Sequence, residues 1–265
     1  MIISHKYKFI FLHSRRTAGN SFSIYYNHFS GPHDIIVEQW HEIIPRGGKP
    51  NQEAVSRLLT NLGNFQFLKN APKTAFKNGF RKDRLTAELL QLSNRVTFRG
   101  DEKLGPRPTH ASAKKVADLF PEEFNNYFKF AFFRDPFQYV LSDFHKKHSR
   151  LKQKGITFDG YLKCMADPER ECPRVRPTPR TNIDVYTFGR NVLAVDYLGS
   201  YGTLTEDLNY ICQRVGLPFR KSDFPHAQNT KSGTKKHRWS TEQIELVEAG
   251  FSDELSFLRD FGYLS

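Results

Sequence analysis

Two apolar runs, each followed directly by a helix-like segment, constrain the fold of this chain more than any other feature. The runs are Tyr7–His13, "YKFIFLH", and Tyr127–Phe133, "YFKFAFF". Both are short and rich in aromatic residues, which is typical of buried strands. Helical spacing follows each run, over residues 20–29 and from Pro136 to about Ser149. This succession predicts an α/β fold with a largely parallel central sheet flanked by helices.

The rest of the chain supplies further elements of the same kind. Shorter apolar runs predict strands over Asp34–Trp40 and Val192–Tyr197. A chain of 265 residues without internal repeats is expected to form one domain, residues 1–265, with irregular insertions around 31–108 and 150–190. Apolar residues at helical spacing predict helices over Gln52–Leu62, Leu85–Leu92, Ala111–Leu119, Leu204–Val215, Thr241–Ala249 and Ser252–Asp260.

The charge balance indicates an anionic partner. The chain has 40 Lys and Arg residues against 28 Asp and Glu, which gives a net charge of +12. Such an excess favours nucleic acid, a phosphorylated cofactor, an acidic glycan or a membrane surface, although a basic balance also serves solubility alone.

No apolar run approaches the ~18 residues of a membrane span, and the first residues lack a signal-peptide pattern. The sequence therefore predicts a soluble, cytoplasmic protein.

The cysteines bear on the redox compartment. Only three are present, Cys164, Cys172 and Cys212, and none has the spacing of a zinc site. A sparse and odd set argues against a disulfide framework and fits a reducing compartment. We therefore expect Cys164 and Cys172 to be unpaired, and we expect no bound metal.

The turn after the first strand, Ser14–Asn20, has the composition of an anion site. Arg15 and Arg16 stand immediately before a helix start, where two cations repel each other and oppose the helix dipole unless an anion is present. Ala18 and Gly19 let the backbone approach a ligand, and the free N–H groups of a helix start bind phosphate. The turn lacks the pattern G-x-x-x-x-G-K-[ST], so a standard nucleoside triphosphatase is not indicated.

The second strand ends in a similar turn. Arg134 follows the strand directly, Asp135 is a candidate N-cap, and Pro136 suits the first turn of the next helix. Ser142 lies two helical turns further on, about 11 Å along the axis. Arg134 and Ser142 reach one phosphate only if the chain bends back at the turn; otherwise Arg134 simply pairs with Asp135. Because ligands bind at the carboxyl ends of parallel strands, both turns are expected at one edge of the sheet.

Two segments of the chain carry a resemblance to a known family. The stretches "FIFLHSRRTAGNSF" (9–22) and "FKFAFFRDPFQYVLSDFH" (128–145) resemble the two cofactor motifs of the sulfotransferase family, in particular its carbohydrate, family 2-like branch. The resemblance covers residues 7–30, 109–148 and 192–263. It implies a P-loop NTPase-like sulfotransferase fold and direct transfer of a sulfuryl group from 3′-phosphoadenosine 5′-phosphosulfate (PAPS) to a hydroxyl of a saccharide-like or other small acceptor. The implied partners are this anionic nucleotide and a small-molecule or glycan acceptor rather than nucleic acid.

The resemblance also implies roles for single residues. Arg134 and Ser142 are implied to grip the 3′-phosphate of the cofactor. Arg16 stands where the family has a lysine that steadies the leaving oxygen, which makes it a catalytic candidate, although a guanidinium is a planar fork rather than a point donor. Arg15 replaces a proline, and Asn20 replaces a threonine. The turn implied to hold the 5′-phosphosulfate comprises Arg15, Arg16, Thr17, Ala18, Gly19, Asn20 and Ser21.

Sulfuryl transfer to a hydroxyl also needs a general base, for which a His or Glu is suitable. His110 is the first candidate, because related carbohydrate sulfotransferases are similar in carrying a histidine ahead of the second motif. Glu38, His41 and Glu42 are further candidates. Because Arg16 replaces the family's lysine, one alternative is that the chain is a family member that binds the cofactor without turning it over. The basic composition also fits a nucleic-acid-binding protein, and a phosphate-binding turn also fits a small-molecule kinase, although the absent loop consensus counts against the kinase.

Overall fold

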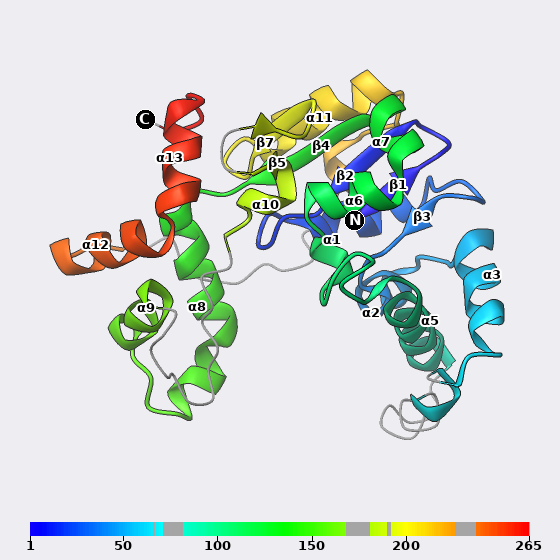
Figure 1. Cartoon of the computed structure of the whole chain (residues 1–265), viewed down its shortest axis with the longest axis horizontal. Helices are drawn as coiled ribbons and strands as arrows, with labels where there is room; N and C mark the ends of the chain where they lie inside the picture. The colour runs from blue at the N-terminus through cyan, green and yellow to red at the C-terminus, as the bar shows by residue number, and fades with distance from the viewer. Residues whose placement is uncertain (66, 71–81, 168–180, 190–191, 226–236, 265) are drawn as a thin grey trace.

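A five-stranded sheet forms the centre of the protein (Figure 1). The computed structural model describes residues 1–65, 67–70, 82–167, 181–189, 192–225 and 237–264. β2 pairs with β4 and β4 pairs with β7 in parallel, whereas β1 is antiparallel to both of its neighbours. The expected α/β fold with a largely parallel sheet is confirmed. In spatial order the strands are β3 (Ile35–Ile36), β1 (Ile2–Ser4), β2 (Phe9–Leu12), β4 (Phe128–Phe133) and β7 (Tyr197–Ser200).

The side chains of the central strands alternate between two apolar faces. Phe9 and Phe11 of β2 join Phe130 of β4 in one buried cluster, whereas Ile10 and Leu12 belong to the cluster on the opposite face. All five side chains are fully buried. A strand that is covered on both faces has apolar residues at successive positions, which explains why the sequence shows a continuous run rather than a polar alternation.

Helices cover both faces of the sheet, so that the sheet is the middle of three layers, as is usual for parallel strands. The cluster of Phe9 also contains residues of α1 (Gly19–Asn27), α2 (Trp40–Ile43), α3 (Gln52–Asn61), α5 (Lys82–Phe98) and α11 (Leu204–Val215). The cluster of Ile10 contains residues of α6 (Ala113–Leu119), α7 (Pro121–Asn126), α10 (Ile183–Tyr186) and α13 (Ser252–Asp260). The remaining short elements are the hairpin of β5 (Thr187–Phe188) with β6 (Val192–Leu193) and the 3₁₀ segments η1 (Ile44–Arg46), η2 (Pro108–His110) and η3 (Lys221–Asp223).

A third apolar cluster lies away from the sheet. The long helix α8 (Pro136–Lys152) starts where β4 ends and runs away from the sheet, with α9 (Phe158–Ala166) and α12 (Thr241–Gly250) beside it (Figure 1). Tyr139, Leu162 and Val247 join these three helices in one buried cluster. In the same view α3 and α5 lie on the opposite side of the molecule.

The sequence predictions hold for the long elements and fail for some short ones. The strand expected over Asp34–Trp40 is confined to β3, because Trp40 already begins α2. The strand expected over Val192–Tyr197 is divided, since β6 pairs only with β5 and β7 joins the main sheet. The helix expected over Leu85–Leu92 is the central part of the longer α5. Propensity defines an element poorly when it spans only a few residues, because tertiary contacts then decide its bounds.

The prediction about the cysteines is wrong at one position. Cys164 in α9 is disulfide-bonded, whereas Cys212 in α11 is free and buried. Cys172 lies outside the described residues. A disulfide needs only two Cβ atoms at the right distance and orientation, and sequence spacing does not reveal this geometry. The cysteines therefore give no support to the expectation of a reducing compartment.

Candidate functional site

The loop between β2 and α1 has an unusual backbone. Arg16 and Ala18 have left-handed conformations, with φ angles of 65° and 61°. A non-glycine residue in this region costs about 1–3 kcal/mol, so neighbouring contacts must hold the loop in shape. One such contact is the Thr17 hydroxyl, which donates to the Ser14 carbonyl over 2.9 Å. Left-handed residues within a turn direct successive N–H groups into a concave site that suits an anion.

Gly19, the first residue of α1, is required by packing. A Cβ at this position would overlap the His13 imidazole. His13 cannot easily move aside, because it is buried and its Nδ1 lies 2.8 Å from Oε2 of Glu38. The backbone of Gly19 also lines the cavity described below. The glycine therefore lets the start of α1 lie directly against the end of β2.

Arg134 approaches the loop from the neighbouring strand. Its Nη1 donates to the carbonyl of Arg16 over 3.1 Å, and its guanidinium lies 4.1 Å from the ring centroid of Tyr201. Asp135 instead caps α8, where its side chain accepts from the N–H of Gln138 at 3.0 Å. This bond confirms the predicted N-cap. Because β2 and β4 are adjacent and parallel, their carboxyl ends bring the two turns together.

Ser142 joins the same group through Arg16. Nη2 of Arg16 donates to the Ser142 hydroxyl over 2.7 Å and also to the Ser142 carbonyl. Arg16 therefore links the loop to α8, while Arg134 bonds to its backbone. Burial lowers the pKa of both guanidinium groups from the ordinary 12.5, and an arginine in a protein stays charged all the same. Two half-buried cations in this arrangement favour an anion between or beside them.

A cavity of about 860 Å³ opens over these residues. It reaches from the loop to α8 on one side and to α5 on the other. Asp143, the acidic residue in its lining, is already bonded to Lys147 at 2.5 Å and to the Tyr161 hydroxyl at 2.6 Å. The cavity therefore carries a strongly positive potential. Its cationic lining consists of Arg15, Arg16, Arg95, Arg99, Arg107, Arg134, Lys146 and Lys147.

The sequence model of the sulfotransferase family matches residues 1–256. The chain belongs to the sulfotransferase family. Membership extends the resemblance of the two motifs to nearly the whole chain and assigns it sulfuryl transfer in general terms. No match was found to a curated protein or to a solved structure. None of the helices in the described part of this sulfotransferase has both the length and the hydrophobicity needed to cross a bilayer.

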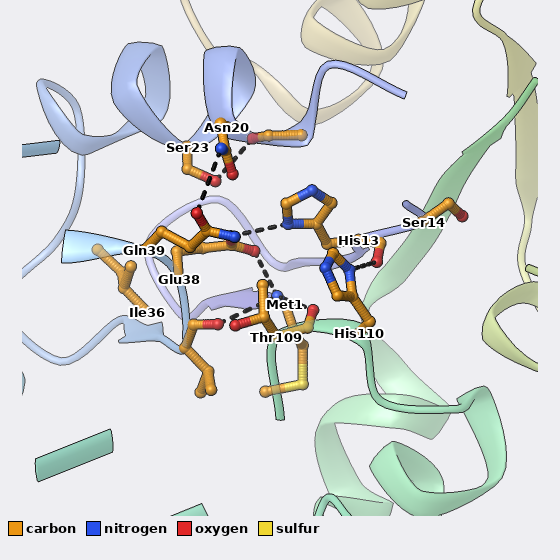
Figure 2. Close-up of polar contacts among 12 residues, drawn as sticks. Met1, His13, Ser14, Asn20, Ser23, Ile36, Glu38, Gln39, Thr109 and His110 are labelled. Carbon is orange, nitrogen blue, oxygen red and sulfur yellow. Dashed lines mark hydrogen bonds and ion pairs between the residues drawn. The ribbon is translucent and has the colours of Figure 1, made fainter. Parts of the chain in front are cut away.

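His110 of this sulfotransferase lies beside the loop, in the cavity lining. Figure 2 shows its ring against that of His13, with Nδ1 bonded to the His13 carbonyl at 2.7 Å. A carbonyl only accepts, so Nδ1 carries the proton and Nε2 of the neutral ring keeps its lone pair. Burial lowers the pKa of His110 well below the ordinary 6.5, and the charges of His13 and Arg15 lower it further. The neutral, basic form of His110 is therefore the stable one at pH 7.

The three further candidates for the general base differ in their access to the cavity. Glu38 is fully buried behind His13, where it bonds to that ring and to the N-terminal ammonium (Figure 2), and it does not reach the cavity lining. Burial alone would raise the pKa of Glu38, but His13 and the ammonium outweigh this effect and lower it. Glu42 forms an ion pair with Arg46 at 2.6 Å, and His41 does line the cavity. Glu38 and Glu42 are thus poorly placed to meet an acceptor.

The other predicted site residues divide into those that line the cavity and one that does not. Arg15, Ala18, Asn20 and Ser21 line the cavity with the residues already described. Thr17 does not, because its hydroxyl is turned inward to Ser14 and the residue is 1% exposed. Thr17 belongs to the turn implied to hold the 5′-phosphosulfate, but its hydroxyl is bonded to Ser14, so its backbone N–H is the group it offers to a ligand.

Sequence reasoning missed several residues of the site. Tyr201, stacked on Arg134, directly follows β7 and lies near β4 only because the two strands pair. Arg95 and Arg99 lie near the end of α5, one helical turn apart, in a segment that resembles no motif. Two arginines four positions apart, just beyond a predicted helix, were the available signal.

Proposed function

We propose that this sulfotransferase transfers a sulfuryl group from PAPS to a hydroxyl of a saccharide-like acceptor. The observation that carries the proposal is the contact of the left-handed loop with Arg134 and Ser142 in one cationic cavity. A nucleotide with a phosphate at each end of its ribose needs two anion sites a short distance apart, one at the loop and one at α8. The residues fit such a ligand, because the buried Nε of Arg134 has no hydrogen-bond partner among the described residues.

Each part of the site then has a task. The N–H groups from Arg15 to Ser21 bind the 5′-phosphosulfate, while Arg134 and Ser142 bind the 3′-phosphate. When bound, PAPS supplies the sulfuryl group and the leaving phosphate. Arg16 places positive charge beside the loop, where negative charge increases as the bond to the leaving oxygen breaks. The cationic lining as a whole lowers the energy of the charged transition state.

His110 is the proposed general base. Its Nδ1 is committed to the His13 carbonyl, so Nε2 is available to take the proton of an acceptor hydroxyl. The lowered pKa of His110 keeps the ring neutral at pH 7, so Nε2 is already free of a proton before the reaction. A base of this kind contributes about 10²- to 10⁴-fold to rate.

The far side of the cavity supports an acceptor that itself carries negative charge. Arg95, Arg99 and Arg107 line it, and all three are exposed. Exposed guanidinium groups bind carboxylates and sulfates through paired hydrogen bonds. An acidic saccharide is the acceptor class that suits this lining together with the base at His110.

Cofactor binding without turnover is the second candidate function. It is favoured by Arg16, which stands in place of the family's lysine and whose guanidinium donates to Ser142. Formation of a sulfated acceptor distinguishes the two candidate functions, because a protein that only binds the cofactor does not form this product. A nucleic-acid-binding role is less well supported, because the cations at the two turns line a cavity that suits a small anionic ligand rather than an extended strand.

Thermal unfolding with and without adenosine 3′,5′-bisphosphate tests the donor site. At 100 times the dissociation constant, binding adds about 2.7 kcal/mol, a rise in Tm of roughly 5–10 °C for a chain of this size. The rise should disappear in Arg134→Ala, remain in the exposed control Lys114→Ala, and be absent with ATP. If the wild type shows no rise at millimolar bisphosphate, the proposal is refuted. Transfer of labelled sulfate from PAPS to acidic and neutral glycans then separates the enzyme from the binder.

A further inference from the structure

The backbone of Arg15 is held on both sides by one side chain. The N–H of Arg15 donates to Oδ1 of Asn182 over 2.7 Å, and Nδ2 of Asn182 donates to the carbonyl of Arg15 over 3.1 Å. A single carboxamide thus satisfies both polar backbone groups of the residue that begins the loop. Asn182 is 1% exposed, so water does not compete for these bonds. The two residues are far apart in the sequence, and no motif connects them.

Asn182 is itself fixed from behind. Its own N–H donates to Oε2 of Glu254 over 3.0 Å, and the Tyr186 hydroxyl donates to Oε1 of the same carboxyl over 2.7 Å. Glu254 and Tyr186 are buried in α13 and α10, in the layer that covers the Ile10 face of the sheet. The start of the loop is therefore connected through Asn182 to two packed helices.

The loop needs such support because of its backbone. Arg16 follows Arg15 directly and is the first of the two left-handed residues, each of which costs about 1–3 kcal/mol. Thr17 stabilises the turn from within, and Arg134 holds the carbonyl of Arg16 from the β4 side. Asn182 holds the residue before the turn from the start of α10. Without this contact the loop can relax to ordinary φ angles, and its N–H groups no longer converge.

We propose that Asn182 is a positioning residue for nucleotide binding, which holds the Arg15 backbone so that the N–H groups of the loop converge on a 5′-phosphate or 5′-phosphosulfate. The inference rests on the proposed function. It concerns the 5′ end of the ligand only, because Asn182 contacts the loop and not Arg134 or Ser142. Asn182 is not in the cavity lining, so its effect on the ligand is indirect.

Calorimetric titration with two nucleotides tests this role. Asn182→Ala should weaken binding of adenosine 5′-monophosphate and adenosine 3′,5′-bisphosphate by the same factor, about tenfold, which corresponds to the loss of about 1.4 kcal/mol. Arg134→Ala should weaken the bisphosphate far more than the monophosphate. Adenosine 3′-monophosphate, which has no 5′-phosphate, should bind Asn182→Ala as tightly as it binds the wild type, whereas a merely structural defect of the site would weaken this ligand as well.

The control is a second buried asparagine with a similar number of bonds. Asn61 donates to the carbonyl of Arg57 and to the hydroxyls of Ser93 and Thr97, between α3 and α5 and away from the cavity lining. Asn61→Ala should lower the free energy of unfolding but leave both dissociation constants unchanged. If Asn182→Ala does not fold, the shorter and polar Asn182→Ser gives the same comparison.

A double substitution tests the contact itself. Arg15→Pro removes the N–H that donates to Asn182, so Asn182→Ala in that background should cost only about two- to threefold in affinity, because the two changes share one bond. The full tenfold loss in the Arg15→Pro background would overturn the inference. Wild-type affinity of Asn182→Ala for both nucleotides would overturn it too and leave the proposed function intact. A wild-type protein that binds neither nucleotide would overturn the proposed function and the inference with it.

Discussion

Glu254 should make the stability of this protein fall as the pH rises from about 4.5 to about 7. The side chain is 1% exposed, and burial raises the pKa of its carboxyl from the ordinary 4.5 to about 7. The bonds from Tyr186 and Asn182 and the charge of Arg15 oppose this rise, and Asp184 adds to it. Between these two pKa values the folded protein binds a proton that the unfolded chain has lost, so raising the pH favours unfolding.

The size of the effect follows from the two pKa values. At about 1.36 kcal/mol for each pKa unit, a rise from 4.5 to about 7 corresponds to about 3 kcal/mol, of which roughly 2.5 kcal/mol falls between pH 5 and pH 8. The variant Glu254→Gln is neutral at every pH and can still accept from Asn182. Its free energy of unfolding should therefore lack this component.

Urea unfolding of both proteins at pH 5, 6, 7 and 8 measures the difference directly. The free energy of unfolding of the wild type, minus that of Glu254→Gln, should decrease by roughly 2.5 kcal/mol from pH 5 to pH 8. Other titrating groups, such as His110, cancel in the subtraction. The exposed Glu245→Gln on α12 is the control and should give a flat difference. A flat or rising difference for Glu254→Gln would refute the assignment of a protonated carboxyl.

Three further outcomes are expected. Gly19→Ala should destabilise the protein by about 1–3 kcal/mol and weaken nucleotide binding, because the new methyl overlaps His13; urea unfolding and calorimetry measure the two effects. His110→Ala should lower kcat by about 10²- to 10⁴-fold and leave the dissociation constant of adenosine 3′,5′-bisphosphate unchanged. In the wild type, the acid limb of the pH profile of kcat/KM should lie below pH 6.5, because burial lowers the pKa of His110. Asp34→Ala should cost roughly 3 kcal/mol or more in urea unfolding, since it leaves the buried Tyr26 hydroxyl and the N–H groups of Lys6 and Gly31 without their acceptor. An unchanged unfolding midpoint for Asp34→Ala would contradict the view of this carboxylate as a buried acceptor.

The sequence predicts the parts of the site that follow from local chemistry. The aromatic run before Arg134 and the N-cap at Asp135 both depend on residues within a few positions of each other. Because a parallel sheet collects the carboxyl ends of its strands, the sequence also predicts that the two turns meet.

The remaining parts depend on pairing between distant segments. Tyr201 reaches Arg134 only through the register of β4 and β7, and Asn182 reaches Arg15 across more than half of the chain. β1 was missed because three residues carry too little periodicity to be distinguished from a loop. The inward turn of the Thr17 hydroxyl depends on backbone angles that no residue type dictates, since neither Arg16 nor Ala18 prefers a left-handed conformation.

His13 makes four distant positions depend on one another. Its ring leaves no room for a Cβ at Gly19, pairs with Glu38 and lies edge-to-face against the ring of His110, with 4.6 Å between the ring centroids. A substitution at any of these positions changes the fit of the others. Among relatives of this chain, the residues at positions 13, 19, 38 and 110 should therefore vary together. A mutant library that varies the four positions together should contain folded combinations whose component substitutions do not fold when made singly.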